Sequence, residues 1–123
     1  MMGEEIPPQL QQELLMREQI RQKLIELLER RQQFEIMLRE TEGALSELDK
    51  VDSSVPVYKS VGPLLVRGDK EKIKSELGER KETLSVQAKT LEKQEERTRK
   101  QLEEKDAKLQ EELKKHGVVR GQD

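Results

Sequence analysis

The sequence predicts a mainly α-helical protein, in which two long helices form an antiparallel coiled-coil hairpin with one small β-hairpin at the bend. Two segments, 9–49 and 69–116, repeat leucine at helical spacing and are rich in Glu, Lys, Arg and Gln, which favour helix. The stretch between them, 55–67, changes to β-branched and turn-forming residues. Because the long segments have similar lengths on either side of this stretch, we expect the chain to fold back on itself.

The composition argues against several classes of protein. Of the 123 residues, 41% are charged, and one Phe and one Tyr are the whole aromatic content, which leaves little material for a globular core. Cysteine is absent, so disulfides and thiolate metal sites are impossible. The net charge is −2, without the concentrated basic face that binds nucleic acid. No apolar run is long enough to span a membrane, so we expect a cytoplasmic protein without membrane partners.

The first predicted helix, 9–49, begins near Pro8, because proline suits the first helical turn. A heptad pattern gives it twelve seam positions, of which eight are apolar, as a coiled coil requires. Leu15, Ile25 and Ile36 fall outside this seam; they either pack on a neighbouring subunit, reveal a slipped register, or bind apolar guests. The twelve seam positions are Leu10, Glu13, Arg17, Ile20, Leu24, Leu27, Arg31, Phe34, Leu38, Thr41, Leu45 and Leu48.

The middle stretch, 55–67, predicts a β-hairpin. Two runs rich in β-branched or large apolar residues, 57–61 and 64–66, flank the turn-forming pair Gly62-Pro63. An isolated hairpin is marginally stable in water and leaves its strand edges unpaired. We therefore expect other chains to cover it. The residues expected to mediate oligomerisation are Val57, Tyr58, Val61, Leu64, Leu65 and Val66.

The second predicted helix, 69–116, has Asp69 as its N-cap and His116-Gly117 as its stop. The eleven-residue step between Leu91 and Leu102 predicts a four-residue stutter in the coiled coil. Because the seam is poorest toward the chain ends, we expect a firm base near the hairpin and fraying tips. The apolar seam positions are Ile73, Leu77, Leu84, Leu91, Leu102, Leu109 and Leu113, with Arg80, Gln87, Gln94 and Thr98 between them.

Four stretches carry a family resemblance: PQLQQ at 8–12, VYKSVGPLLV at 57–66, KETL at 81–84 and TLEKQEE at 90–96. Together they resemble the archaeal-type β subunit of prefoldin, and the similarity extends over essentially the whole chain. A single β-hairpin fits the β class, since the α class carries two. The resemblance implies one prefoldin-like domain over 1–123, with 1–7 and 117–123 as flexible tips.

The resemblance also implies a function. It implies an ATP-independent chaperone subunit, a holdase, in a hexamer of two α and four β subunits whose hairpins assemble into a β-barrel. The coiled-coil tips would capture unfolded protein clients and deliver them to a group II chaperonin, without a cofactor. The implied chaperonin contacts are Lys114, Lys115 and Arg120. The implied client-binding residues are Ile6, Leu10, Leu14, Leu15, Leu109, Leu113, Val118 and Val119.

The sequence also leaves three other classes of function open. A structural spacer would use the helices only to set a distance. A nucleic-acid-binding coiled coil would use the basic run 97–100, although glutamates flank that run on both sides. An enzyme is least favoured, because His116 is the only histidine and lies near the chain end, and because the many carboxylates fit a solvated helix face.

Overall fold

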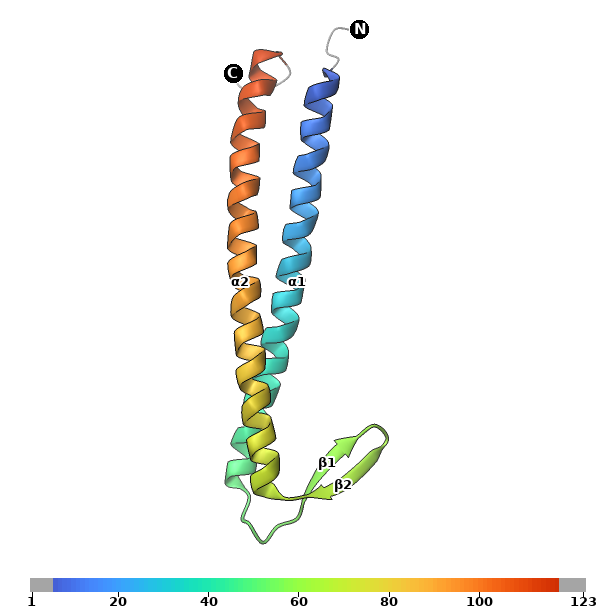
Figure 1. Ribbon diagram of the computed structural model, residues 1–123, viewed down its shortest axis with the longest axis vertical. Helices are drawn as coiled ribbons and strands as arrows, with labels where there is room; N and C mark the ends of the chain where they lie inside the picture. The colour runs from blue at the N-terminus through green and yellow to red at the C-terminus, as the bar shows by residue number, and fades with distance from the viewer. Residues whose placement is uncertain (1–5, 118–123) are drawn as a thin grey trace. The chain divides into compact units, whose positions relative to one another are not determined.

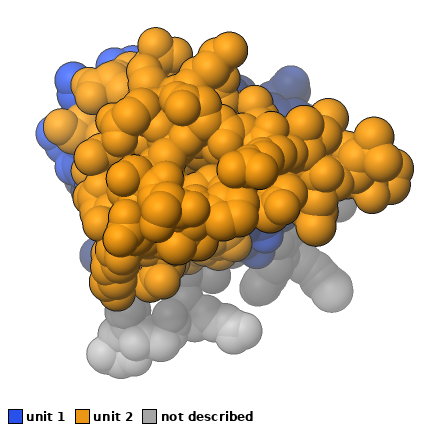
Figure 2. Space-filling model, turned by 90° about the horizontal axis from the view of Figure 1, so that it is seen from below, with its two compact units in different colours: residues 1–29, 91–123 blue, residues 30–90 orange. Residues whose placement is uncertain are grey.

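The structure is a computed structural model that describes residues 6–117. Its elements are α1 (Pro8–Lys50), β1 (Val57–Val61), β2 (Leu64–Gly68) and α2 (Lys70–Lys115) (Figure 1). The prediction of two long helices with one antiparallel two-stranded hairpin between them is confirmed. The chain divides into two compact units, unit 1 of residues 1–29 with 91–123 and unit 2 of residues 30–90 (Figure 2). The single domain expected over 1–123 stays a prediction.

α1 begins at Pro8, as the sequence predicts. The carbonyl of Pro7 accepts a hydrogen bond from the backbone N–H of Gln11 at 2.9 Å and closes the first turn. The side-chain amide of Gln11 donates to the carbonyl of Ile6 at 2.8 Å. All twelve predicted seam positions of α1 are buried or half-buried, so the predicted register of this helix is confirmed. Thr41 is 4% exposed and donates its hydroxyl to the Met37 carbonyl, which satisfies the buried polar group.

α2 begins and ends where its caps predict. The Asp69 carboxylate accepts the N–H of Lys72 at 2.9 Å, which is the contact of an N-cap. At the other end, Gly117 has φ +68° and donates its N–H to the Lys114 carbonyl at 3.0 Å. A glycine in this left-handed conformation is a common helix stop. No helix within residues 6–117 has an apolar stretch long enough to cross a membrane.

The seam of α2 differs from the predicted one in the middle of the helix. Ala88 and Glu95 are buried, at 8% and 5% exposure, and they restore the regular alternation of three- and four-residue steps between Leu84 and Leu109. The predicted stutter is therefore wrong. A coiled-coil seam has two alternating heptad positions. Leu84 and Leu91 occupy one of them and Leu102 and Leu109 the other, while Ala88 and Glu95 fill the places between. The predicted seam residues that are exposed instead are Arg80, Gln87 and Gln94.

The β-hairpin pairs from Val57 opposite Gly68 to Val61 opposite Leu64, so β2 continues two residues beyond its predicted end. Gly62 has φ +57°, and a two-residue hairpin turn requires a positive φ at this position. A Cβ on Gly68 would lie 2.6 Å from the Cδ1 atom of Ile73. Glycine therefore lets the end of β2 pass close to the first turns of α2.

Candidate interaction surfaces

The hairpin of unit 2 exposes apolar side chains on both of its faces. Residues directly opposite each other in an antiparallel pair share a face. One face therefore carries Val61, Leu64 and Val66 around Lys59, and the other carries Tyr58 and Leu65 with Ser60 and Arg67. Leu65 is 74% exposed, the largest value among the large hydrophobic side chains of residues 6–117, and Leu64 is 63% exposed.

Two lysines connect α2 with the hairpin and with the linker, residues 51–56, that joins α1 to β1. Lys59 on β1 reaches the Glu76 carboxylate at 3.0 Å, and Lys70 donates to the carbonyl of Val51 in the linker at 2.5 Å. Both contacts lie within unit 2. The six residues predicted to mediate oligomerisation are thus held together on one projecting element of this unit (Figures 1 and 2). Five of them are exposed, and Val57, at the start of β1, is half-buried.

An apolar pocket of about 360 Å³ lies at the root of this hairpin, and we call it the root pocket. Leu48 and Val51 line it from the end of α1, Val55 and Tyr58 from the linker and β1, and Ile73 and Leu77 from α2. The sequence does not predict this pocket. Its walls come from three separate segments of the chain. In the sequence, each segment shows only the pattern of a coiled-coil seam or of a linker, and none of these patterns indicates a pocket.

The residues predicted to bind clients are buried to different extents in unit 1. Fraying tips would leave the leucines near the chain ends partly exposed, but Leu10 and Leu109 are only 5% and 4% exposed. They fill neighbouring places in the seam, where the helices stay paired. Leu15 is 58% exposed. Ile6, Leu14 and Leu113 are half-buried, and Val118 and Val119 lie outside the described residues.

Two hollows lie beside the seam of unit 1 near its ends. One, of about 330 Å³, is lined by Leu10 and Leu109 together with the polar residues Glu13, Glu112 and His116. The other, of about 360 Å³, lies along Leu14, Leu109 and Leu113. Both hollows are lined by leucines together with charged side chains, so their walls are partly apolar and partly polar.

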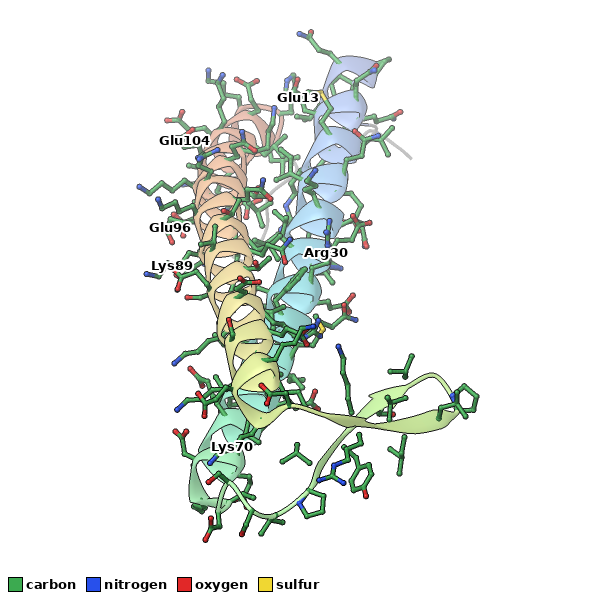
Figure 3. All side chains as sticks on the ribbon, turned by 60° about the horizontal axis from the view of Figure 1, so that its bottom comes forward. Glu13, Arg30, Lys70, Lys89, Glu96 and Glu104 are labelled. Atoms are coloured by element: carbon green, nitrogen blue, oxygen red, sulfur yellow. The ribbon has the colours of Figure 1, made fainter. Side chains whose placement is uncertain are left out.

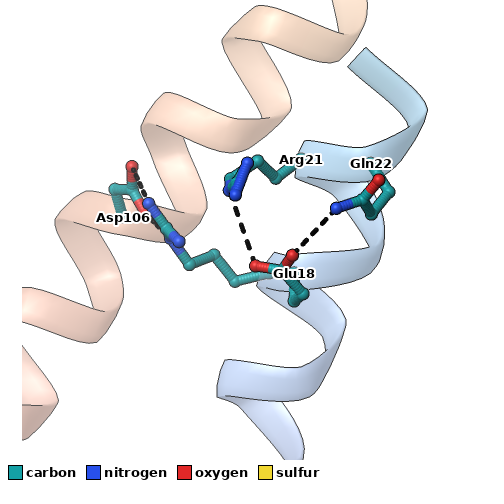
Figure 4. A network of polar contacts seen from close by, with 5 residues as sticks. Glu18, Arg21, Gln22 and Asp106 are labelled. Atoms are coloured by element: carbon teal, nitrogen blue, oxygen red, sulfur yellow. Dashed lines mark hydrogen bonds and ion pairs between the residues drawn. The ribbon is translucent and has the colours of Figure 1, made fainter. Parts of the chain in front are cut away.

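Ion pairs join the two helices of unit 1 beside these hollows. Arg17 donates to the Asp106 carboxylate at 2.5 Å, next to a cluster of Glu18, Arg21 and Gln22 (Figure 4). Asp106 raises the pKa of Arg17, so that guanidinium stays charged.

A second pair between the helices joins Lys105 to Glu13 at 2.6 Å. The hydrogen bond from Lys105, together with its positive charge, lowers the pKa of Glu13. The carboxylate therefore stays ionised further into the acid range than an isolated glutamate would.

The model of the family described as "Prefoldin subunit" matches residues 11–116. The chain belongs to the prefoldin subunit family. It is similar to the prefoldin β subunit of Archaeoglobus fulgidus, at 47% identity over 88 residues, or 72% of this chain and 76% of that one. The prefoldin β subunit of Saccharolobus islandicus strain L.S.2.15 is 40% identical over 121 residues, or 98% and 96% of the two chains.

A solved structure gives the same result. The crystal structure of the prefoldin β subunit from Thermococcus strain KS-1 is similar with a TM-score of 0.80 at 37% identity, and the match covers 91% of this chain and 97% of that one. Prefoldin subunits are chaperone subunits, and the family is not a known family of enzymes. Within residues 6–117, no three Asp, Glu or His side chains are grouped so that they could hold a metal ion.

The basic residues of this prefoldin chain are dispersed and partly neutralised. Arg99, in the run considered for nucleic acid, lies 3.0 Å from Glu95 and 3.9 Å from Glu96. Glu96 and Glu104 point outward from α2 (Figure 3). Of the residues implied in chaperonin contact, Lys114 and Lys115 are exposed in the last turn of α2, and Arg120 lies outside the described residues.

Proposed function

We propose that this chain is the β-class subunit of an ATP-independent holdase, a cytoplasmic prefoldin hexamer of two α and four β subunits. The observation that carries this proposal is the projecting hairpin, whose strands expose apolar side chains on both faces. Such a hairpin is marginal on its own and is stabilised when strands of other subunits cover it. Its assembly with neighbouring hairpins into a β-barrel leaves the ends of the helices available for other contacts.

In this proposal the ends of the helices in unit 1 capture non-native polypeptides. Leu15 and Met16 offer exposed apolar surface, and Leu14 and Leu113 line a hollow. Fully covering one such side chain contributes about 1.5–3 kcal/mol. Several subunits in one assembly hold a client more tightly than one subunit can, because linked sites act at high effective concentration.

A truncation separates the holdase from a structural spacer. Residues 1–14 and 111–123 are deleted, and the variant is assembled with an α-class prefoldin subunit. The assembly is then tested for suppression of aggregation of thermally unfolded citrate synthase, measured by light scattering. A holdase loses suppression while native mass spectrometry still finds the hexamer. Full suppression by the truncated hexamer would contradict client capture by the helix ends.

A point variant with a matched control refines this test. Leu15 and Ile36 are three heptads apart on the outer face of α1 and are 58% and 47% exposed, but they belong to units 1 and 2 respectively. Leu15→Ser weakens suppression of aggregation, whereas Ile36→Ser leaves it unchanged. Equal loss from both variants would point to a general loss of surface hydrophobicity.

Delivery to a group II chaperonin is the last part of the proposal, with Lys114, Lys115 and Arg120 as the contacts. Lys114 and Lys115 lie in the last turn of α2, and Arg120 follows them in the sequence; all three would meet acidic groups of the partner. Replacing all three by glutamate weakens binding of the hexamer to a purified group II chaperonin in a pull-down, while suppression of aggregation persists. Undiminished binding would remove these residues from the contact.

A further inference from the structure

The two ion pairs that join the helices of unit 1 lie at its seam. Glu13, a seam residue of α1, lies 2.6 Å from Lys105 of α2. Arg17, the next seam residue of α1, donates to Asp106 of α2 (Figure 4). These four side chains are 20–45% exposed, and pairs so well solvated contribute little to stability. Charged groups at a seam can instead select one alignment of two helices, because other alignments leave them without partners.

The leucines of unit 1 accept more than one alignment, because they recur at heptad spacing. Leu10 and Leu109 line one hollow in the observed alignment. A first slip of one heptad would put Leu102 in the place of Leu109, opposite Leu10. A second slip, in the other direction, would put Leu102 opposite Leu24. Either slip therefore keeps a leucine pair in the seam.

The ion pairs of unit 2 and the linker also accept a slip. Lys81 lies 3.9 Å from Glu42, and Lys74 lies 2.9 Å from Asp49. Both the acids and the lysines are seven residues apart, so either slip keeps one acid–lysine pair. The linker, 51–56, would lose one hydrogen bond to α2. When extended it spans up to about 20 Å, whereas a heptad of helix is only about 10 Å long.

The ion pairs of unit 1 do not accept either slip. The second slip would bring Glu13 opposite Glu112. The first would bring Arg17 opposite Arg99, with which it would share Glu95, the carboxylate that Arg99 already contacts at 3.0 Å. In both slips the charged partners on α2 would face apolar side chains, where an unpaired charge is unfavourable. These apolar residues are Ile6 and Leu10 in the first slip and Ile20 and Leu24 in the second.

We propose that the two ion pairs of unit 1 select the alignment of α1 on α2. They disfavour the two slipped alignments that the leucines, the ion pairs of unit 2 and the linker all accept. The alignment in turn decides which side chains line the hollows near the ends of unit 1. It can be measured on the chain alone, so its test is independent of the proposed function.

Disulfide formation within one chain reports the alignment, because the natural chain has no cysteine. Leu10→Cys with Leu109→Cys reports the observed alignment. Leu10→Cys with Leu102→Cys reports the first slip, and Leu24→Cys with Leu102→Cys reports the second. Each reporter replaces two seam leucines, so the losses of packing are matched. After mild oxidation, mass spectrometry of tryptic peptides should find the observed disulfide and neither slipped one.

Charge reversal on α1 tests the selection. Glu13→Lys with Arg17→Glu turns both ion pairs into like-charge contacts, and it gives the second slip an attractive contact with Glu112. We expect the ratio of slipped to observed disulfides to rise about tenfold or more, because two weak attractions become repulsions. An unchanged ratio in a folded variant would overturn the proposal.

A second reversal and a control complete this experiment. Lys105→Glu with Asp106→Arg, added to the reversed α1, re-forms both ion pairs with opposite polarity and should restore the observed disulfide. The control is Glu18→Lys with Arg21→Glu, which reverses an exposed pair within α1 and should leave the alignment unchanged. Failure of the fourfold reversal to restore the alignment, or an equal shift in the control, would contradict the selection.

A leucine variant separates alignment from stability, and it also serves if charge reversal unfolds unit 1. Apolar packing in place of solvated ion pairs should raise the melting temperature, followed by circular dichroism. The variant should nevertheless form slipped disulfides beside the observed one. The observed disulfide alone would overturn the proposal, whatever the melting temperature. The substitutions are Glu13→Leu, Arg17→Leu, Lys105→Leu and Asp106→Leu.

Discussion

Leu84 and Val86 lie two residues apart on α2 and have opposite surroundings. Leu84 is 5% exposed in the seam of unit 2, and Val86 is 56% exposed on the outer side of the same helix. In a two-helix structure no second layer covers the outer side. The stability of each unit therefore depends on a few seam residues, while most other side chains are free to vary.

Leu84→Asp should destabilise unit 2 by about 3 kcal/mol or more. The substitution removes a buried leucine and places an unpaired charge in an apolar seam. Thermal unfolding followed by circular dichroism measures the effect. Val86→Asp is the matched control and should change the melting temperature little. Similar melting of both variants would contradict the seam assignment of α2.

Within the elements, the ends of α1 and α2 in unit 1 are joined by ion pairs as well as by leucines. Lys105 lies 2.6 Å from Glu13, and Arg17 lies 2.5 Å from Asp106. These side chains are partly exposed to solvent, so each pair contributes little to global stability and is screened by salt. Their effect is local, and they fix how the helix ends lie beside the hollows.

Acid should loosen this part of unit 1. The pKa of Glu13 is lowered by the hydrogen bond from Lys105. The stabilisation is therefore complete above the ordinary pKa of a glutamate and is lost as the pH falls through the lowered pKa. Amide hydrogen exchange near Glu13 should speed up across that window, and Glu13→Gln should remove most of the pH dependence. Glu26→Gln, at an exposed position of α1, is the control. A pH response that persists in Glu13→Gln would exclude this pair as its cause.

For the whole molecule, the different roles of the helices and the hairpin follow from where apolar surface remains exposed. The helices pair with each other along their seam, whereas the hairpin exposes Tyr58, Leu64 and Leu65 with nothing in residues 6–117 to cover them. The helices can therefore form within one chain, whereas the proposed function has other subunits cover the hairpin.

Val61→Lys should leave helix content unchanged and prevent assembly. Val61 is 50% exposed on the hairpin, and a lysine there adds a third positive charge to the hairpin, on the same face as Lys59. Circular dichroism reports the helices, and static light scattering with the α-class partner reports assembly. Ile36→Lys, which alters an exposed apolar residue of α1, should still assemble. A full-sized complex from Val61→Lys would remove the hairpin from its proposed role.

The sequence by itself determined the order of the elements, the start of α1 at Pro8, the Asp69 cap, the Gly117 stop and the Gly62 turn. These features depend on local backbone chemistry, which a residue and its near neighbours decide. The seam of α1 could also be predicted from the sequence, because most of its heptad positions are leucine, isoleucine or phenylalanine.

Only the tertiary structure decided that Ala88 and Glu95 complete the seam of α2, that Leu10 and Leu109 are buried, and that a pocket lies at the root of the hairpin. Burial in a two-helix seam depends on which face of each helix meets its partner. An alanine or a glutamate at such a place gives no apolar signal in the sequence. The root pocket is built from segments far apart along the chain, so it exists only once they are packed together.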